Sequence, residues 1–391
     1  MNSITNFLFL ILTIMYIIRA ENKNHMDQDN NRLEFNNDGT FKILHLSDVH
    51  YRIPDTDCRD VAPNELCTSG NNATLSFINR LIDVEKPDLI VHTGDIIDGD
   101  THSAADGMNA IYGVSIKHKI KWTASLGNHD DDSDMSRPEL IDYIIKMPGT
   151  LTVDNPLGND DEYEAYGNYF LELFNSSTST IPSFRTYHLD SNTNDISMNS
   201  DQINWFKKQS HINSIKGATP AMAFFHVPLQ EYITALFKGD SIIGNVREHP
   251  SPSFINSGFF DALVDEGSVI ATFVGHDHTN DYCAKYKDIQ LCYEGSPGYQ
   301  GYGQCSILKD PSNYCVSRRA RVTQIRDWGS KVTSWKRIDV LPNRNNNEEE
   351  GASTYIEDDQ ILWEKNNELN NEDKNNFPLK PELKNLPFLS Q

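Results

Sequence analysis

The sequence predicts a layered α/β fold. Short apolar runs of strand length alternate with segments of helical periodicity along most of the chain. Such alternation is typical of strands joined by helices that pack on the faces of a sheet. The part of the chain with this pattern, about 300 residues, is large for one domain but within the range of an α/β enzyme. Near its end, residues 318–325 and 331–338 alternate as antiparallel strands do.

The individual elements follow from these patterns in chain order. We predict buried strands at residues 41–47, 88–94, 121–127, 221–226 and 268–274. A helix is predicted over residues 74–85, where four apolar residues at helical spacing share one face: Leu75, Ile78, Leu81 and Ile82. A further helix precedes the third strand. Another begins at Ser136, which forms a capping box with Glu139 and has Pro138 near the first turn. The segment 259–267 before the last strand is also helical.

Both ends of the chain are predicted to lie outside the domain, which we place at residues 40–341. Residues 1–20 contain an apolar run that ends at the small residue Ala20, which is typical of a secretory signal peptide; an uncleaved anchor is the alternative, because no Lys or Arg precedes the run. Residues 21–39 are polar and residues 342–391 are rich in Asn and Glu, so we expect both segments to be disordered. We expect no stable membrane span after signal cleavage, since no other stretch is apolar enough.

The cysteines fit an exported chain, because disulfides persist in oxidising compartments. The chain has 6 cysteines: Cys58, Cys67, Cys283, Cys292, Cys305 and Cys315. Their grouping favours pairing of the first two and pairing among the last four, while the full connectivity stays open. A zinc site of these thiols is the competing interpretation, disfavoured because none lies in a Cys-x-x-Cys pair. Two sequons, at Asn72 and Asn175, are candidate glycosylation sites, so we expect a glycoprotein that is secreted or resides in the endolysosomal lumen.

The formal charge of the chain is −22, from 56 acidic and 34 basic residues. A field of this sign repels nucleic acid and anionic membranes. We therefore expect neither as a partner.

Polar residues cluster directly at the end of each predicted buried strand. In chain order the clusters are Asp48 and His50; Asp95 and Asp98; Asn128, His129 and Asp130; His226; and His276 with His278. Ligands of open α/β sheets bind outside the carboxyl ends of the strands, so these clusters are expected to face one crevice. Carboxylate oxygens together with imidazole nitrogens suit zinc, iron or manganese. Two such metals, with one carboxylate bridging them at about 3.5–4 Å, are able to clamp a phosphoryl oxygen.

The ordered motifs Asp-x-His, Gly-Asp-x-x-Asp-Gly, Gly-Asn-His-Asp, His and Gly-His-x-His resemble those of the calcineurin-like metallophosphoesterase superfamily, over roughly residues 41–340. The surroundings "FFHVPLQE", "GHDHTNDYC" and "RRARV" look most like its purple acid phosphatase-like branch. The resemblance implies two mixed β-sheets packed face to face and flanked by helices, and two divalent or trivalent metal ions. It places Asp48, His50, Asp95 and His278 around one ion, and the bridging Asp95 with Asn128, His226 and His276 around the other.

One position departs from that branch. Purple acid phosphatases have a metal-binding tyrosine three positions after the bridging aspartate, where this chain has Asp98, so we expect a colourless enzyme. An aspartate there is similar to the serine/threonine protein phosphatases, in which it orients the histidine of the Gly-Asn-His motif. We therefore interpret Asp98 and His129 as a catalytic dyad in which His129 protonates the leaving oxygen and a metal-bridging hydroxide is the nucleophile. Asp130 is interpreted as a support of the motif.

The segment 292–305, rich in glycine and tyrosine, follows the last predicted ligands. We interpret Tyr299 and Tyr302, together with Asn280 and Tyr282, as walls of a substrate pocket. The alternative is a disulfide-tied surface loop without contact to substrate.

The function expected from these residues is metal-dependent hydrolysis of phosphate monoesters, with a small molecule or a phosphoprotein as substrate. Hydrolysis of phosphodiesters or lipid phosphates is the alternative within the same fold, because these enzymes share the metal ligands. A catalytically silent secreted glycoprotein is the second alternative. The presence of His129 argues against it, since a fold kept only for binding has no need of a proton donor.

Overall fold

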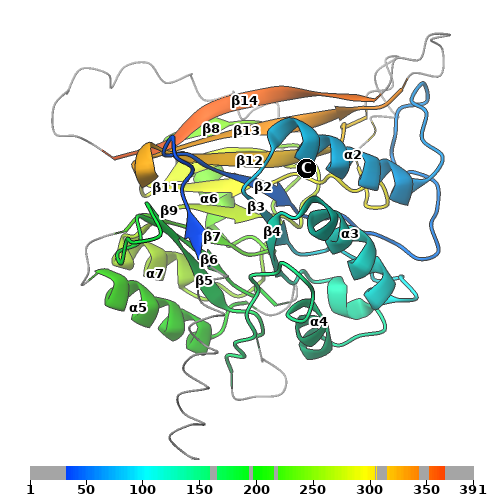
Figure 1. The fold of residues 1–391 in the computed structure, drawn as a ribbon. Helices are drawn as coiled ribbons and strands as arrows, with labels where there is room; N and C mark the ends of the chain where they lie inside the picture. The colour runs from blue at the N-terminus through cyan, green and yellow to red at the C-terminus, as the bar shows by residue number, and fades with distance from the viewer. Residues whose placement is uncertain are drawn as a thin grey trace, which may run out of the picture.

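The computed structural model of the protein describes residues 32–158, 165–192, 197–214, 219–303, 305, 315–342 and 352–365. Its centre is formed by two β-sheets (Figure 1). The six-stranded sheet has the order β14-β13-β12-β2-β3-β4. Its strands are β2 (Phe41–Leu46), β3 (Leu89–Thr93), β4 (Lys121–Ser125), β12 (Arg319–Arg326), β13 (Lys331–Val340) and β14 (Ser353–Glu364). The sheet is mixed, because β2, β3 and β4 run parallel while β12, β13 and β14 pair antiparallel.

The eight-stranded sheet has the order β1-β5-β6-β7-β9-β11-β10-β8. Its strands are β1 (Leu33–Glu34), β5 (Tyr169–Phe174), β6 (Phe184–His188), β7 (Ala221–Phe224), β8 (Ser241–Ile243), β9 (Val269–Val274), β10 (Cys283–Tyr286) and β11 (Ile289–Tyr293). It is also mixed, since β6, β7, β9 and β11 are parallel neighbours and β10 pairs antiparallel with both β11 and β8.

Helices cover the outer face of each sheet, so the molecule has four layers (Figure 1). On the six-stranded sheet lie α2 (Gly70–Glu85), α3 (Ala104–His118) and α4 (Arg137–Ile144), and on the eight-stranded sheet lie α5 (Ser200–Ser214), α6 (Glu231–Lys238) and α7 (Phe259–Glu266). Two short 3₁₀ helices are η1 (Asp130–Asp132) and η2 (Asp327–Gly329). The predicted fold class, two mixed sheets flanked by helices, is confirmed.

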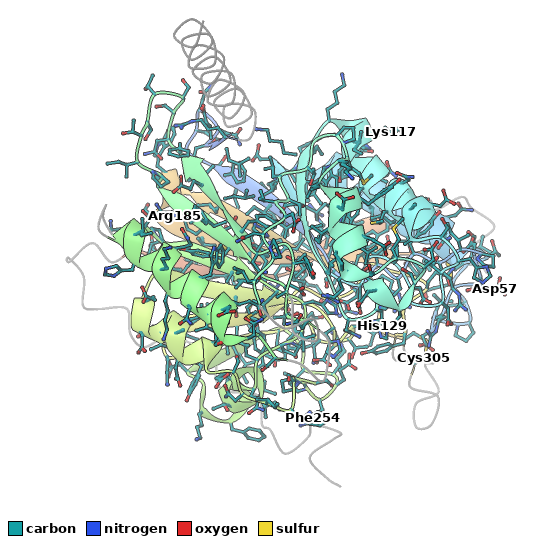
Figure 2. The ribbon with its side chains drawn as sticks, turned by 90° about the horizontal axis from the view of Figure 1, so that it is seen from below. Asp57, Lys117, His129, Arg185, Phe254 and Cys305 are labelled. Carbon is teal, nitrogen blue, oxygen red and sulfur yellow. A yellow bond between two sulfur atoms is a disulfide. The ribbon has the colours of Figure 1, made fainter. Side chains whose placement is uncertain are left out.

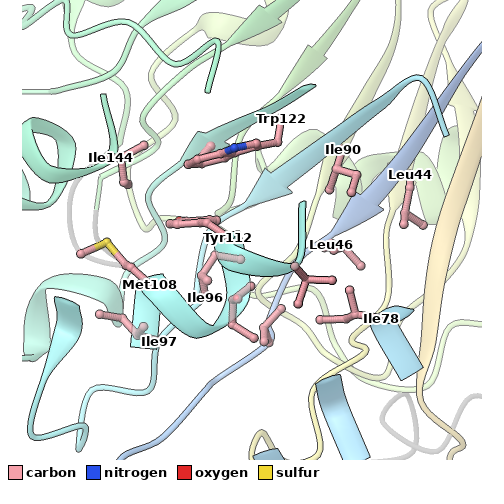
Figure 3. Close-up of a cluster of buried hydrophobic side chains, with 14 of the residues drawn as sticks. Leu44, Leu46, Ile78, Ile90, Ile96, Ile97, Met108, Tyr112, Trp122 and Ile144 are labelled. Atoms are coloured by element: carbon pink, nitrogen blue, oxygen red, sulfur yellow. The ribbon is translucent and has the colours of Figure 1, made fainter. Parts of the chain in front are cut away.

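Three buried clusters explain this layering. One joins β2, β3 and β4 to α2, α3 and α4, and includes Leu44, Ile90 and Trp122 (Figure 3). A second joins the eight-stranded sheet to α5, α6 and α7. The third lies between the sheets, where Val91 of one sheet and Phe224 of the other belong to the same cluster. Because every buried strand has apolar residues on both faces, each is able to pack against a helix layer and the other sheet at once.

The predicted helices are present, with small corrections. The capping box at the start of α4 is confirmed, since the Ser136 N–H donates to the Glu139 carboxylate at 2.9 Å. Helix α2 begins at Gly70 rather than at residue 74, because the Ser69 side chain caps it by accepting from the Asn72 N–H. Phe77, rather than Leu75, completes its fully buried face.

The expectation of a disordered tail is wrong for residues 353–364, which form β14. Pairing with β13 over most of their length overrides the polar composition, and Asp358 forms an ion pair at 2.5 Å with the buried Lys336 of β13. In the same way Leu33 and Glu34, in the N-terminal segment predicted to be disordered, pair with β5. The predicted signal peptide lies outside the described residues. Within the part of the chain that the structure describes, no helix combines the length and apolarity that a membrane crossing requires.

Candidate metal centre

Four residues at the strand ends have a left-handed backbone. The φ angles of Asp48, His50, Asp95 and His276 are 54°, 48°, 48° and 72°. Residues with a side chain seldom adopt such values, and those that do gather at functional sites. Hydrogen bonds between the strand ends hold them: the Asp48 N–H donates to the Gly94 carbonyl at 3.1 Å and the His50 N–H to the Asp95 carbonyl at 2.9 Å.

Six of the seven predicted ligands form two groups of three. Asp48, His50 and His278 make one group and Asp95, His226 and His276 the other, and within each group the possible ligand atoms lie within 4.8 Å of one another. The seventh, Asn128, has its Oδ1 3.1 Å from His226 Nε2.

Asp95, a member of the second group, also faces the first. Its Oδ2 is 3.1 Å from His226 Nε2 and 3.6 Å from His50 Nε2. Gly127 lies directly beside it. A side chain is not tolerated there, because a Cβ on Gly127 would lie 2.2 Å from Asp95 Oδ1. The chain folds closely around this carboxylate, which has the position that a bridging ligand requires.

The histidines are oriented by contacts to their outer nitrogens. His226 Nδ1 donates to the Thr93 carbonyl at 2.8 Å, and His278 Nδ1 donates to the Tyr302 carbonyl at 2.9 Å. Such bonds fix the tautomer and leave Nε2 as the free ligand atom. His50 turns its Nε2 toward His278 Nε2, at 3.0 Å. The imidazoles therefore converge as metal ligands do.

The electrostatics of the site favour a bound cation. Burial raises the pKa of Asp48 to about 7, and the Asp95 carboxylate adds to this rise, although His226 opposes it. Burial acts to lower the pKa of His226, but Asp95 and Asp48 raise it to about 10. Buried negative charge of this strength attracts a compensating positive charge. Burial also lowers the pKa of His276 to about 3, which leaves a neutral imidazole for ligation. With its carboxylate, amide and imidazole donors the site fits zinc, iron or manganese.

The predicted dyad of Asp98 and His129 is wrong in its pairing. His129 Nδ1 lies 2.9 Å from Asp132 Oδ2, whereas Asp98 Oδ2 lies 3.7 Å from His50 Nδ1. Asp132 follows His129 by three residues through η1, so the turn brings its carboxylate to the ring. That spacing is visible in the sequence and was the available signal. His129 stays beside the groups, because its N–H donates to Asp95 Oδ1 at 2.8 Å.

Asp130 braces the turns that carry the candidate ligands. Its carboxylate accepts from the N–H groups of Asp95 at 3.0 Å, Ile96 at 2.9 Å and Gly127 at 2.7 Å. A buried carboxylate that accepts several backbone bonds ties the ends of β3 and β4 together. This arrangement agrees with the support role predicted for Asp130.

A cavity of about 690 Å³ opens over the candidate ligands. Of the four predicted pocket residues only Tyr302 lines it, with its ring stacked on His278 at 3.8 Å between centroids. Asn280 instead accepts from two backbone N–H groups, Tyr282 is fully buried in a hydrophobic cluster, and the Tyr299 hydroxyl donates to Asp339 at 2.8 Å. These three predictions are wrong, because the chain turns inward to β10 after His278 and again at Tyr299. Sequence reasoning missed Arg59, Asp132 and Glu248, which also line the cavity.

All six cysteines are paired. The disulfides are Cys58–Cys67, Cys283–Cys292 and Cys305–Cys315, which confirms the predicted grouping and excludes a zinc site of these thiols. Asn72 and Asn175 are both exposed, so each is accessible to glycosylation, which stays a prediction.

Metal loading is expected to stabilise the fold. A ligand that binds only the folded state, present at one hundred times its Kd, adds about 2.7 kcal/mol to the free energy of unfolding. Chelation should lower the unfolding free energy by about this amount per ion, and added zinc, manganese or iron should restore it, as measured by urea unfolding. In the variant His226→Ala, added metal should raise the free energy of unfolding by less than in the wild type. An unfolding curve that is the same with and without bound metal would contradict the assignment.

Comparison with known proteins gives a consistent set of relatives. The profile of the calcineurin-like phosphoesterase family matches residues 41–280. The chain is 34% identical to the protein named probable inactive purple acid phosphatase 14 of Arabidopsis thaliana, over 86% of this chain and 88% of that one. It is 31% identical to phosphatase DCR2 of Saccharomyces cerevisiae, over 81% of this chain and 57% of that one. Among solved structures, GAP50 of Plasmodium, the anchor in the inner membrane complex, has a similar fold, with a TM-score of 0.50 and 13% identity over 83% of this chain and 89% of that one.

Proposed function

The chain belongs to the calcineurin-like phosphoesterase family, and on that premise we propose that it is a metal-dependent phosphatase that hydrolyses phosphate monoesters. The observation that carries the proposal is the pair of three-residue groups, of which Asp95 belongs to one and also faces the other, beneath a cavity that His129 also lines. The Arabidopsis relative has the word "inactive" in its name. Activity is nevertheless supported by the seven candidate ligands and by His129, all of which this chain has.

The candidate ligands fall into two sets. Asp48, His50, Asp95 and His278 would hold one metal, and Asp95, Asn128, His226 and His276 the other. When bound, the metals activate water and polarise the phosphoryl oxygens. The chain's own residues keep the candidate ligands ordered, since Asp48 and His226 are fully buried and the outer nitrogens of His226 and His278 are held by carbonyl oxygens.

His129 is the proposed proton donor. Hydrolysis adds water across the phosphorus–oxygen bond and yields an alcohol and inorganic phosphate, so the departing oxygen must gain a proton. His129 is about half exposed at the cavity, and Asp132 Oδ2, at 2.9 Å from its Nδ1, orients the ring. Asp98, which faces His50, orients a candidate ligand instead.

Replacing His129 with glutamine should slow the hydrolysis of alkyl phosphates far more than that of p-nitrophenyl phosphate. An alkoxide is too basic to leave without a proton, and general acid catalysis is worth about 10²–10⁴-fold, whereas p-nitrophenolate leaves unaided. We expect a loss of that size in kcat for ethyl phosphate and a loss of roughly tenfold or less for p-nitrophenyl phosphate. Asp134→Asn, on the same segment but bonded to the Ala104 N–H, is the control and should change neither rate greatly. Equal losses for both substrates would show that His129 is not the acid.

The proposal is tested directly with p-nitrophenyl phosphate and bis-p-nitrophenyl phosphate, assayed from acid to neutral pH with the metals present. Turnover of the monoester supports it. A strong preference for the diester would favour the phosphodiesterase alternative. Absence of turnover for both esters, in folded protein with bound metal, would favour the silent glycoprotein.

We also propose that the chain is exported. The apolar residues 1–20, the three disulfides and the exposed sequons at Asn72 and Asn175 support a secreted or endolysosomal location. Removal of a glycan from the protein secreted by a eukaryotic host, seen as a shift in mass, would test this.

A further inference from the structure

A second cavity adjoins the metal centre. It has a volume of about 850 Å³ and is walled by Ile233 of α6 and by Pro250, Pro252 and Phe254 of the loop between β8 and α7. We call these four residues the apolar groove. His276 lines both this groove and the cavity over the candidate ligands. The two spaces therefore meet at a predicted metal ligand, so that one molecule is able to occupy both.

A highly exposed apolar side chain borders the groove, and its neighbour in the chain is exposed as well. Phe254 is 85% exposed and Ile255 64% exposed, the two largest fractions among the exposed large hydrophobic residues of the described chain. Figure 2 shows Phe254 at the edge of the molecule, on the opposite side of the view from Lys117. Single exposed apolar residues are ordinary, but those that border a concave space beside a polar site mark a place for an apolar ligand.

The loop that carries Phe254 is held in place before any ligand binds. Gln230 Nε2, at the start of α6, donates to the carbonyls of Ser253 at 3.1 Å and Phe254 at 2.9 Å. The Ser251 N–H donates to Asp277 Oδ2 at 3.0 Å, and Asp277 stands between His276 and His278. Pro250 and Pro252 restrict the backbone further. Little conformational entropy is lost when an ordered wall of this kind accepts a ligand.

The two cavities differ in the polarity of their lining side chains, and this difference indicates which end of a ligand each would hold. The cavity over the candidate ligands has acidic and imidazole side chains that suit metal-held phosphate. The groove beyond His276 is walled by the four apolar residues defined above. It has no acidic side chain, and its other borders are Gln230, Thr234, His249, Ser251 and Ser253. Of the two, the groove is the place for hydrocarbon.

We propose that the apolar groove binds the leaving group of the substrate, and that the preferred substrates are phosphate monoesters of apolar alcohols. This inference rests on the proposed function and adds its substrate class. The phosphate stays at the metal centre while the hydrocarbon passes His276 and packs against Ile233 and Phe254.

A series of n-alkyl phosphates tests the groove. The leaving alcohols of ethyl, butyl and hexyl phosphate have nearly equal basicity, so differences in kcat/KM report binding of the chain. Complete burial of one methylene is worth about fourfold, and in an open groove we expect about twofold, hence roughly tenfold or more from ethyl to hexyl phosphate. Phe254→Ser and Ile233→Ser should each reduce this gradient to about threefold or less. Phe237→Ser is the matched control. Phe237 is 50% exposed on α6, the helix of Ile233, but lies outside the groove, so its variant should keep the gradient.

A binding measurement separates the groove from the activity. Ethylphosphonate and hexylphosphonate have a carbon–phosphorus bond that a phosphatase does not cleave, and their affinities for the metal-loaded protein are measured by calorimetry. If no ester is hydrolysed but hexylphosphonate binds more tightly and Phe254→Ser removes the difference, the groove is supported and the phosphatase proposal falls. If p-nitrophenyl phosphate is hydrolysed without any effect of alkyl length, the groove is overturned and the phosphatase stands. A gradient that survives both groove variants would overturn the groove as the binding place.

Discussion

Replacing Asp95 with asparagine is expected to reduce hydrolysis of p-nitrophenyl phosphate by at least about a thousandfold, since two metals held as proposed would contribute several kcal/mol of transition-state stabilisation. Asp95 is the carboxylate that lies within 3.1 Å of His226 Nε2 and 3.6 Å of His50 Nε2, and so faces both groups. Asparagine keeps its size and is able to accept the 2.8 Å bond from the His129 N–H, but it offers no negative charge to share between two cations. Metal content should fall together with the rate.

The matched control is Asp100→Asn. Asp100 lines the same cavity, but its side chain is 74% exposed and pairs at 2.9 Å with Arg52. A surface pair of this kind contributes little, so the rate should stay within about threefold of the wild type. The proposal for Asp95 would be overturned by a folded Asp95→Asn protein that retained a tenth or more of the activity, with circular dichroism as the check on folding.

Replacing Asp281 with asparagine is expected to give the largest loss of stability, about 3–5 kcal/mol. The Asp281 carboxylate is fully buried and contacts three cations: Arg319, Lys336 at 2.7 Å and Arg247 at 2.5 Å. Burial acts to raise its pKa, but Arg319 and the other cations hold it well below the usual range. Without this charge Lys336, whose side chain is also fully buried, keeps fewer partners, and an uncompensated buried cation is costly.

The measurement for Asp281 is urea unfolding of the variant and the wild type at neutral pH, where the carboxylate is ionised in both states of the wild-type protein. Asp288→Asn is the control. The Asp288 side chain is 93% exposed and pairs with Lys285 at 3.0 Å, so its loss should change the unfolding free energy by about 0.5 kcal/mol or less. A change of similar size in the two variants would mean that the buried network does not contribute as described.

The strands that carry the candidate ligands were predictable because their signal is local. An apolar run such as residues 41–46 leads directly into Asp48 and His50, and the parallel strands of a sheet bring such ends together. Strand β14 was not predictable in this way. Its acidic residues predict a disordered tail. The segment is a strand because it pairs with β13, and composition carries no information about such pairing.

The prediction of the pocket residues was wrong for a related reason. The spacing of Tyr282, Tyr299 and Tyr302 does not say which side of the turning chain each ring faces, and only Tyr302 turns to the cavity. The apolar groove had no sequence signal either, because Ile233 and Phe254 come from separate segments, which hydrogen bonds from Gln230 to the loop join. Contacts between distant segments decide both features.

Strand β14 occupies the edge of the six-stranded sheet, a place where an unpaired backbone invites a second molecule to add a strand. Its acidic residues Asp359 and Glu364 are exposed, so two copies that approach each other at that edge bring like charges together. The pairing of β14 with β13 is also interrupted by two register shifts, which disturb the flat geometry that intermolecular pairing needs. The acidic composition that resembles that of a disordered tail thus opposes pairing of two folded copies edge to edge.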